Sequence, residues 1–272
     1  MAGAAAERQE TGLVNKINNA VRTNQKNPIT LIAGKTKLTG VVKAEKYSGR
    51  QTSGSEPYTD VVIHVKSGKG TKPVNLSMKG ESAPSLAGGG LRGLELAVPG
   101  IAKRYMKSVY KHLTEKENLN PGDKVPDVYG RISPTRKEKI VVGNVAMGGP
   151  IDYMYIGPMT VTGRYDKQNN VLTVSGALTE AKAYAKSHDL YFRLRARRED
   201  QRFDPEAKDS DGTPKVYGAV LLDRLISAPT VKLAWFVLPL PFAQLPFAPS
   251  QNLPASASIA TMITSFCDHD AM

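Results

Sequence analysis

The sequence predicts an α/β (α+β) protein with a central mixed sheet flanked by helices, a β-rich second half and an extended Pro-rich C-terminal arm. Two stretches, residues 7–24 and 91–117, carry apolar side chains at helical spacing. Short alternating runs bounded by Gly, Ser and Asn indicate strands between and after them. Beyond residue 227 the chain becomes Pro-rich and then Ser- and Ala-rich, which suits an arm better than a domain.

The composition allows a folded core and favours an anionic partner. A chain of 272 residues with 40% hydrophobic content is not wholly disordered. Its single cysteine, Cys267, excludes an intrachain disulfide and a Cys-rich zinc site. The net charge of +12 favours nucleic acid, although acidic proteins and lipid headgroups also attract a basic surface.

The first residues and the apolar stretch near the other end show whether secretion or membrane insertion is to be expected. The start, MAGAAAERQETG, lacks the pattern of a secretory signal, so we expect an intracellular or virion-associated protein that is not secreted. The apolar stretch 233–249 contains four prolines, which exclude a continuous membrane helix. We therefore expect no membrane partner, and we expect 233–249 to cover the protein's own core, a second copy or another protein.

The first half reads as helix, strands and helix. Leu13, Ile17 and Val21 set the register of the helix over 7–24, which Pro28 terminates. Short strands are expected over 29–32 and 38–42. Two longer ones, over 59–65 and 74–78, are joined by the turn-forming sequence SGKGTKP and predict an antiparallel hairpin. The helix over 91–117 is interrupted at Pro99.

The whole chain divides into four predicted parts. Residues 1–117 form the α/β core, and 118–150, with several prolines and charges, is a connecting segment. Residues 151–226 form a β-rich basic half, with a hairpin turning near Asn169 and Asn170. Residues 227–272 form the arm.

The hairpin over 56–81 carries the most informative chemistry. Asp60 begins one strand, and the triplet Ser77-Met78-Lys79 ends the next. Antiparallel pairing brings both to one end of the sheet. Side chains alternate along a strand, so Ser77 and Lys79 are expected on the solvent side and Met78 against the core. The sequence therefore predicts a carboxylate and an amine in one site.

This arrangement resembles the PD-(D/E)XK nuclease superfamily, in which an acidic residue and an acidic-x-Lys triplet lie on adjacent strands. The likeness covers residues 9–110 and includes a preceding helix bearing Glu10 and a long helix after the triplet. The resemblance implies that Asp60 and the Met78 carbonyl bind Mg²⁺ (or Mn²⁺), while Lys79 orients or activates the attacking water. Such a metal lowers the pKa of its water and neutralises charge on the phosphate.

One position departs from the family pattern. Ser77 stands where the triplet normally begins with an acidic residue or Gln, and a hydroxyl is a poorer Mg²⁺ ligand than a carboxylate. Some family members with Ser there recruit a Glu from the following helix. Glu95 is the candidate for that role, with Glu81 less suited to it. Without such a Glu, the fold would be kept and the activity lost.

Three sets of basic residues are candidates for binding the nucleic-acid backbone. Arg193, Arg195 and Arg197 alternate along one predicted strand and share a face. Lys103 and Lys107 are one turn apart on the long helix. Arg92 ends a Gly-rich loop that lacks the Walker pattern, so nucleotide hydrolysis is not expected. The alternative for the arginines is a solvated face whose Arg residues pair with acids, for the lysines an ordinary solvated helix face, and for the loop with Arg92 a mobile surface loop.

Two functions follow as expectations. The first is a Mg²⁺-dependent DNA endonuclease acting on double-stranded DNA, with Asp60, Lys79 and either Glu95 or Glu10 at its centre. The second is a non-enzymatic viral structural or assembly protein, of minor capsid or cement type, that uses a basic body and the apolar arm. A non-catalytic nucleic-acid binder on the same fold is a third reading of the same residues.

Overall fold

The computed structural model describes residues 2–50, 56–81, 90–195, 202–208, 212 and 219–224. By compactness the chain divides into Met1–Leu238 and Pro239–Met272. The second unit and the whole of the predicted arm 227–272 lie outside the described residues. The described part confirms the predicted α+β class, because helices flank a large mixed sheet.

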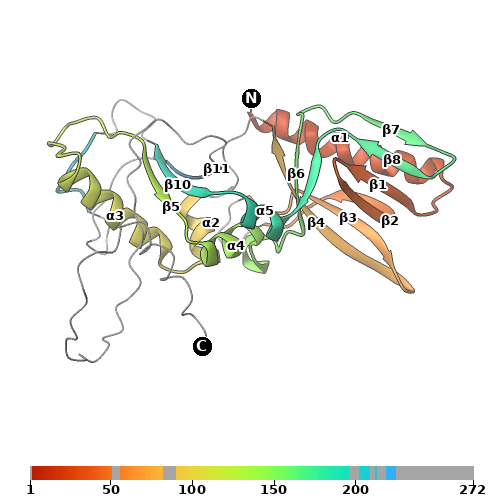
Figure 1. Cartoon of the computed structure of the whole chain (residues 1–272), viewed down its shortest axis with the longest axis horizontal. Coiled ribbons are helices and arrows are strands. Elements are labelled where there is room, and N and C mark those ends of the chain that lie inside the picture. Colours follow the sequence, from red (N-terminus) through yellow and green to blue (C-terminus); the bar gives the residue numbers. More distant parts are fainter. Residues whose placement is uncertain are drawn as a thin grey trace, which may run out of the picture. The chain divides into compact units, whose positions relative to one another are not determined.

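A long N-terminal helix, α1 (Ala2–Thr23), covers one face of this sheet. Its buried side chains, Leu13, Ile17, Ala20 and Val21, recur at the predicted helical spacing. They pack on apolar residues of the sheet, and α1 contacts β2 and β4 most closely (Figure 1). The helix begins before residue 7 because the alanine-rich start favours helix.

The sheet has eight strands in the order β7-β8-β1-β2-β3-β4-β6-β9. In chain order they are β1 (Ile29–Ala33), β2 (Thr36–Lys46), β3 (Val61–Ser67), β4 (Gly70–Gly80), β6 (Tyr153–Gly157), β7 (Gly163–Asp166), β8 (Val171–Val174) and β9 (Ala177–Glu180). The β3–β4 and β7–β8 pairs are antiparallel hairpins as predicted. The β3–β4 turn is shorter than the predicted connection SGKGTKP, because pairing continues to Ser67 and Gly70. By contrast, β1 with β8 and β4 with β6 pair in parallel.

A second hydrophobic core is formed mainly by the part of the chain between β4 and β6 and after β9, and it also includes Tyr58 and Met154. The helix predicted over 91–117 is present as two pieces separated near Pro99. The elements are α2 (Gly90–Ala97), α3 (Ile101–Glu115), β5 (Val128–Arg131), α4 (Pro134–Val142), the 3₁₀ helix η1 (Val145–Met147), α5 (Ala181–Ser187), β10 (Leu190–Arg195) and β11 (Ala219–Arg224). The three short strands form their own sheet, in the order β11-β10-β5.

The division predicted at 117, 150 and 226 does not match the strand pairing. Residues 118–150 are not a plain connection, since they contain β5, α4 and η1. Pro134 is the first residue of α4, a position where proline begins a helix and does not break it. The strands β6 to β9, assigned to the second half, complete the sheet begun by the first half. Parallel pairing joins segments distant in sequence, and no local pattern reveals it.

The two faces of β4 are both covered. Leu76 and Met78 belong to the core beneath α1. Ser77 pairs in register with Met154, which belongs to the second core. Ser77 is consequently only 4% exposed, and the prediction that it lies on the solvent side is wrong. The sequence does not show that a second layer packs on that face at this point.

Among the described helices, none is both long enough and apolar enough to cross a membrane.

Candidate active site

The predicted carboxylate and triplet do meet at one end of the sheet. Asp60 directly precedes β3, and its backbone N–H donates to the Leu76 carbonyl at 2.8 Å. At the next position of the β3–β4 hydrogen-bond ladder, the Asp60 side chain takes the place of a backbone carbonyl, because the Met78 N–H donates to Asp60 Oδ2 at 2.5 Å. The Ser77 hydroxyl donates to the same oxygen at 3.3 Å. Lys79 Nζ lies 3.9 Å from it.

These contacts leave the other oxygen of Asp60 open. All three fall on Oδ2, and within the described residues Oδ1 accepts no hydrogen bond. The Met78 carbonyl points to the same side of β4 as its N–H, since both groups of one strand residue do so. The Asp60 side chain is 22% exposed and that of Lys79 19%. The site is therefore half-buried and reachable from solvent.

A second carboxylate comes from α1. Glu10 Oε2 lies 3.1 Å from Lys46 Nζ at the end of β2, and Lys46 is also 3.4 Å from Glu7 Oε1. Lys46 pairs with Val61, the residue that follows Asp60, so Glu10 lies at the same end of the sheet as Asp60, and the charge of Asp60 contributes to raising the pKa of Glu10. Glu10 was predicted from the family resemblance alone. The helix, β2, β3 and β4 each supply a charged residue to this end of the sheet.

Burial is the main cause of the raised pKa of both carboxyl groups, Asp60 and Glu10. Burial raises the pKa of Asp60, and the opposing effects of Lys79, the Met78 N–H and the Ser77 hydroxyl only partly offset it. Burial likewise raises the pKa of Glu10, which the hydrogen bond from Lys46 opposes and the charge of Asp60 reinforces. Burial alone would lower the pKa of Lys46, but Glu10 and Glu7 outweigh it and raise that pKa.

Gln9 holds α1 to the sheet beside these residues. Its amide nitrogen donates to the carbonyls of Gly157 at 2.9 Å, Pro158 at 3.1 Å and Lys79 at 3.3 Å. The side chain is only 1% exposed. Sequence reasoning missed Gln9, although a signal was present: Gln9 falls four residues before Leu13, in register with the buried face of the helix.

Glu95 is committed elsewhere. It lies on α2, and its Oε2 accepts a hydrogen bond of 2.6 Å from the Gly100 N–H, which precedes α3. No hydrogen bond joins it to Asp60 among the residues that the structure describes. Glu81, the other candidate, is exposed just after β4. The carboxylates whose charges act together with that of Asp60 are Glu10, from the preceding helix, and Glu56, four residues before Asp60.

The donor set fits Mg²⁺ or Mn²⁺ only in part. In the described ranges no group of three His, Cys, Asp or Glu side chains could hold a metal ion. Magnesium needs fewer protein ligands, because it keeps several waters and binds through one or two carboxylates together with substrate phosphate. Asp60 Oδ1, Glu10 and the Met78 carbonyl meet that lower requirement.

Of the predicted basic contacts, Arg193 is the one that the described residues show to be occupied by other groups. Arg193 is bound to Asp127, with Nε 3.0 Å from Oδ2, and its guanidinium lies over the Tyr129 ring. Its face of β10 is covered as well, since Tyr191 is buried. The arginine face predicted for this strand is therefore covered at Arg193, whose guanidinium is paired with an acid.

Four of the other five predicted basic residues lie on described helices or strands. Arg195 belongs to β10 and Arg92 to α2. Arg197 lies outside the described residues. Lys103 and Lys107 are exposed on α3, one turn apart.

Comparison of the chain with protein-family models, curated proteins and solved structures found no match.

Proposed function

We propose that the protein is a Mg²⁺-dependent endonuclease of PD-(D/E)XK type that hydrolyses a phosphodiester bond in double-stranded DNA. The observation that carries the proposal is the meeting of Asp60, Lys79 and Glu10 at one end of the sheet. Lys79 Nζ is 3.9 Å from Asp60 Oδ2, and Glu10 Oε2 is 3.1 Å from Lys46 Nζ, whose residue pairs with Val61 directly after Asp60. Two repelling, partly desolvated carboxylates beside an ammonium are suited to binding a divalent cation.

The chain order around the site supports the same proposal. A helix bearing Glu10 precedes the strands, Asp60 and the triplet lie on adjacent antiparallel strands, and helices follow β4. The chain then returns as β6, parallel to β4. The superfamily likewise combines an N-terminal helix, an acidic residue, a triplet ending in Lys and a crossover helix.

Each residue has a distinct part in the proposed reaction. Bound Mg²⁺ would supply a water of lowered pKa and neutralise charge developing on the phosphate. Asp60 Oδ1, Glu10 and the Met78 carbonyl would hold the ion. Lys79 would orient the attacking water and stabilise negative charge on the phosphate oxygens. Ser77 and the Met78 N–H fix Asp60 through its other oxygen. Lys46, paired with Glu10, holds that carboxylate in place.

Plasmid cleavage with Mg²⁺ or Mn²⁺ tests the proposal. We expect wild type to nick or linearise supercoiled plasmid, and Asp60→Asn and Lys79→Met each to reduce the rate by about 100-fold or more. Glu10→Gln should reduce it by about tenfold or more, and EDTA should abolish cleavage.

The chain offers a matched control. Glu138 and Lys182 form an exposed pair 3.6 Å apart on α4 and α5, so Glu138→Gln and Lys182→Met make the same chemical changes away from the site. Both should cleave like wild type. Activity that survives Asp60→Asn and Lys79→Met, or wild type that binds DNA without cleaving it in either metal, would refute the proposal.

The assembly alternative depends on residues 227–272, which lie outside the described residues. It stays a prediction of the sequence, as does a partner bound through 233–249.

A further inference from the structure

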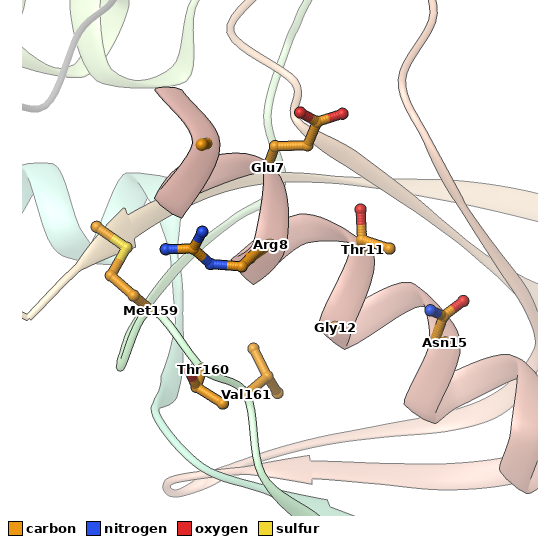
Figure 2. A pocket seen from close by; sticks show the side chains of 9 residues that line it. Glu7, Arg8, Thr11, Gly12, Asn15, Met159, Thr160 and Val161 are labelled. Atoms are coloured by element: carbon orange, nitrogen blue, oxygen red, sulfur yellow. The ribbon is translucent and has the colours of Figure 1, made fainter. Parts of the chain in front are cut away.

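A groove runs between α1 and the segment that follows β6. Its volume is about 570 Å³, and it is lined by the exposed side of α1 on one wall and by residues 159–161 on the other. Figure 2 shows Arg8 extending from the helix toward Met159, with Thr160 and Val161 next along the same segment. Nothing in the proposed reaction uses this groove.

The helix wall presents hydrogen-bond donors in a line. Arg8, Thr11 and Asn15 line the groove and lie three and four residues apart, so they share one side of α1. All three are exposed. Within the described part of the chain their side chains have no hydrogen bond or ion pair. The line spans about 10 Å at 1.5 Å per residue, which corresponds to about three base-pair steps measured along the axis of a DNA duplex.

The charge in the groove favours an anion. Glu7 also lines it, but its carboxylate is paired with Lys46 at 3.4 Å. Among the described residues that line the groove, Arg8 carries a charge that has no ion-pair partner. A guanidinium binds phosphate oxygens in a bidentate manner. Met159, 40% exposed, adds an apolar contact on the opposite wall.

The groove adjoins the proposed catalytic centre. Glu7 at its edge shares Lys46 with Glu10, and Gln9, between Arg8 and Glu10, binds the carbonyl of Lys79. A chain of phosphates that placed one phosphate at Asp60 could continue into the groove along α1. An uncharged or cationic ligand would leave Arg8 without a partner.

We propose that this groove binds the phosphodiester backbone of the DNA strand beside the cleaved bond, with Arg8 as its main phosphate contact and Met159 against the sugars. The position of the cleaved bond rests on the proposed nuclease function. The contact with the backbone is independent of sequence, since it involves no base edges.

Binding of a labelled DNA duplex in EDTA, followed by fluorescence anisotropy, tests the groove without requiring cleavage. We expect Arg8→Ala to weaken binding about three- to tenfold and to lower the slope of log K against log[salt] by about 1. Met159→Asp, which places a negative charge in the groove, should weaken binding at least as much. The matched control is Lys186→Ala, which removes one positive charge from an exposed position on α5 and should bind like wild type.

The outcomes separate the groove from the nuclease. If Arg8→Ala and Met159→Asp bind like wild type, or Lys186→Ala weakens binding equally, the groove assignment is overturned even when cleavage depends on Asp60 and Lys79. If wild type does not bind DNA, the groove assignment also fails. If Arg8→Ala weakens binding while wild type never cleaves, the groove is supported and the proposed nuclease activity is what fails.

Discussion

Replacing Gln9 with methionine should destabilise the protein and disturb the proposed active site together. The Gln9 amide is buried and has two protons for three carbonyls, those of Gly157, Pro158 and Lys79. Methionine keeps the volume but donates nothing, so about two hydrogen bonds are lost and buried acceptors are left unpaired. At about 1–2 kcal/mol for each, the loss is about 2–4 kcal/mol.

Equilibrium urea unfolding measures this loss. With a slope of about 2 kcal/mol/M, the midpoint should fall by about 1–2 M. The variant should still fold, because domains of this kind have about 5–15 kcal/mol of stability. Since Gln9 ties α1 to the end of β4, plasmid cleavage by the folded variant should also fall, although Gln9 has no role in the proposed chemistry.

An exposed glutamine provides the comparison. Gln168, in the β7–β8 turn, is exposed, and Gln168→Met should change stability by less than about 0.5 kcal/mol. If Gln9→Met is as stable as Gln168→Met, the three contacts contribute nothing net and the reasoning is wrong. If Gln9→Met loses stability but cleaves at the wild-type rate, Gln9 supports the fold without positioning the site.

Three other predictions concern a metal, an ion pair and a turn. Mg²⁺ at 100-fold excess over Kd should raise the free energy of unfolding of wild type by about 2.7 kcal/mol, and therefore its Tm, but should not raise the Tm of Asp60→Ala. Equal rises in Tm measured by calorimetry would exclude Asp60 as a ligand. Arg193→Ala should lower the free energy of unfolding, measured in urea, by about 1–3 kcal/mol, because half-buried Asp127 loses its partner. DNA affinity should be unchanged, and weaker DNA binding would mean that Arg193 contacts the DNA backbone. Gly34 (φ 61°) and Gly68 (φ 56°) both have a left-handed backbone, so replacing either with alanine should lower the free energy of unfolding by about 1 kcal/mol. Gly34→Ala should cost more, because its Cβ would lie 2.8 Å from the Cβ of Ala177, whereas Gly68 faces open space. Equal losses of Tm would mean that the β1–β2 turn relieves the clash.

The sequence by itself determined the local elements and the most informative contact of the site. The spacing of Leu13, Ile17 and Val21 is enough to define α1, because helical periodicity is a property of neighbouring residues. Likewise, the β3–β4 hairpin brings Asp60 to the triplet through a short turn, so strand alternation and turn composition suffice to predict the pair.

The tertiary structure alone decided what surrounds that contact. The parallel pairs β1–β8 and β4–β6 join segments far apart in the chain, and the second core buries Ser77 on a face that alternation placed in solvent. Packing of α1 also places Glu10 at the same end of the sheet as Asp60, whereas Glu95 accepts a hydrogen bond from the Gly100 N–H. Such choices depend on how distant surfaces fit together, which no window of neighbouring residues encodes.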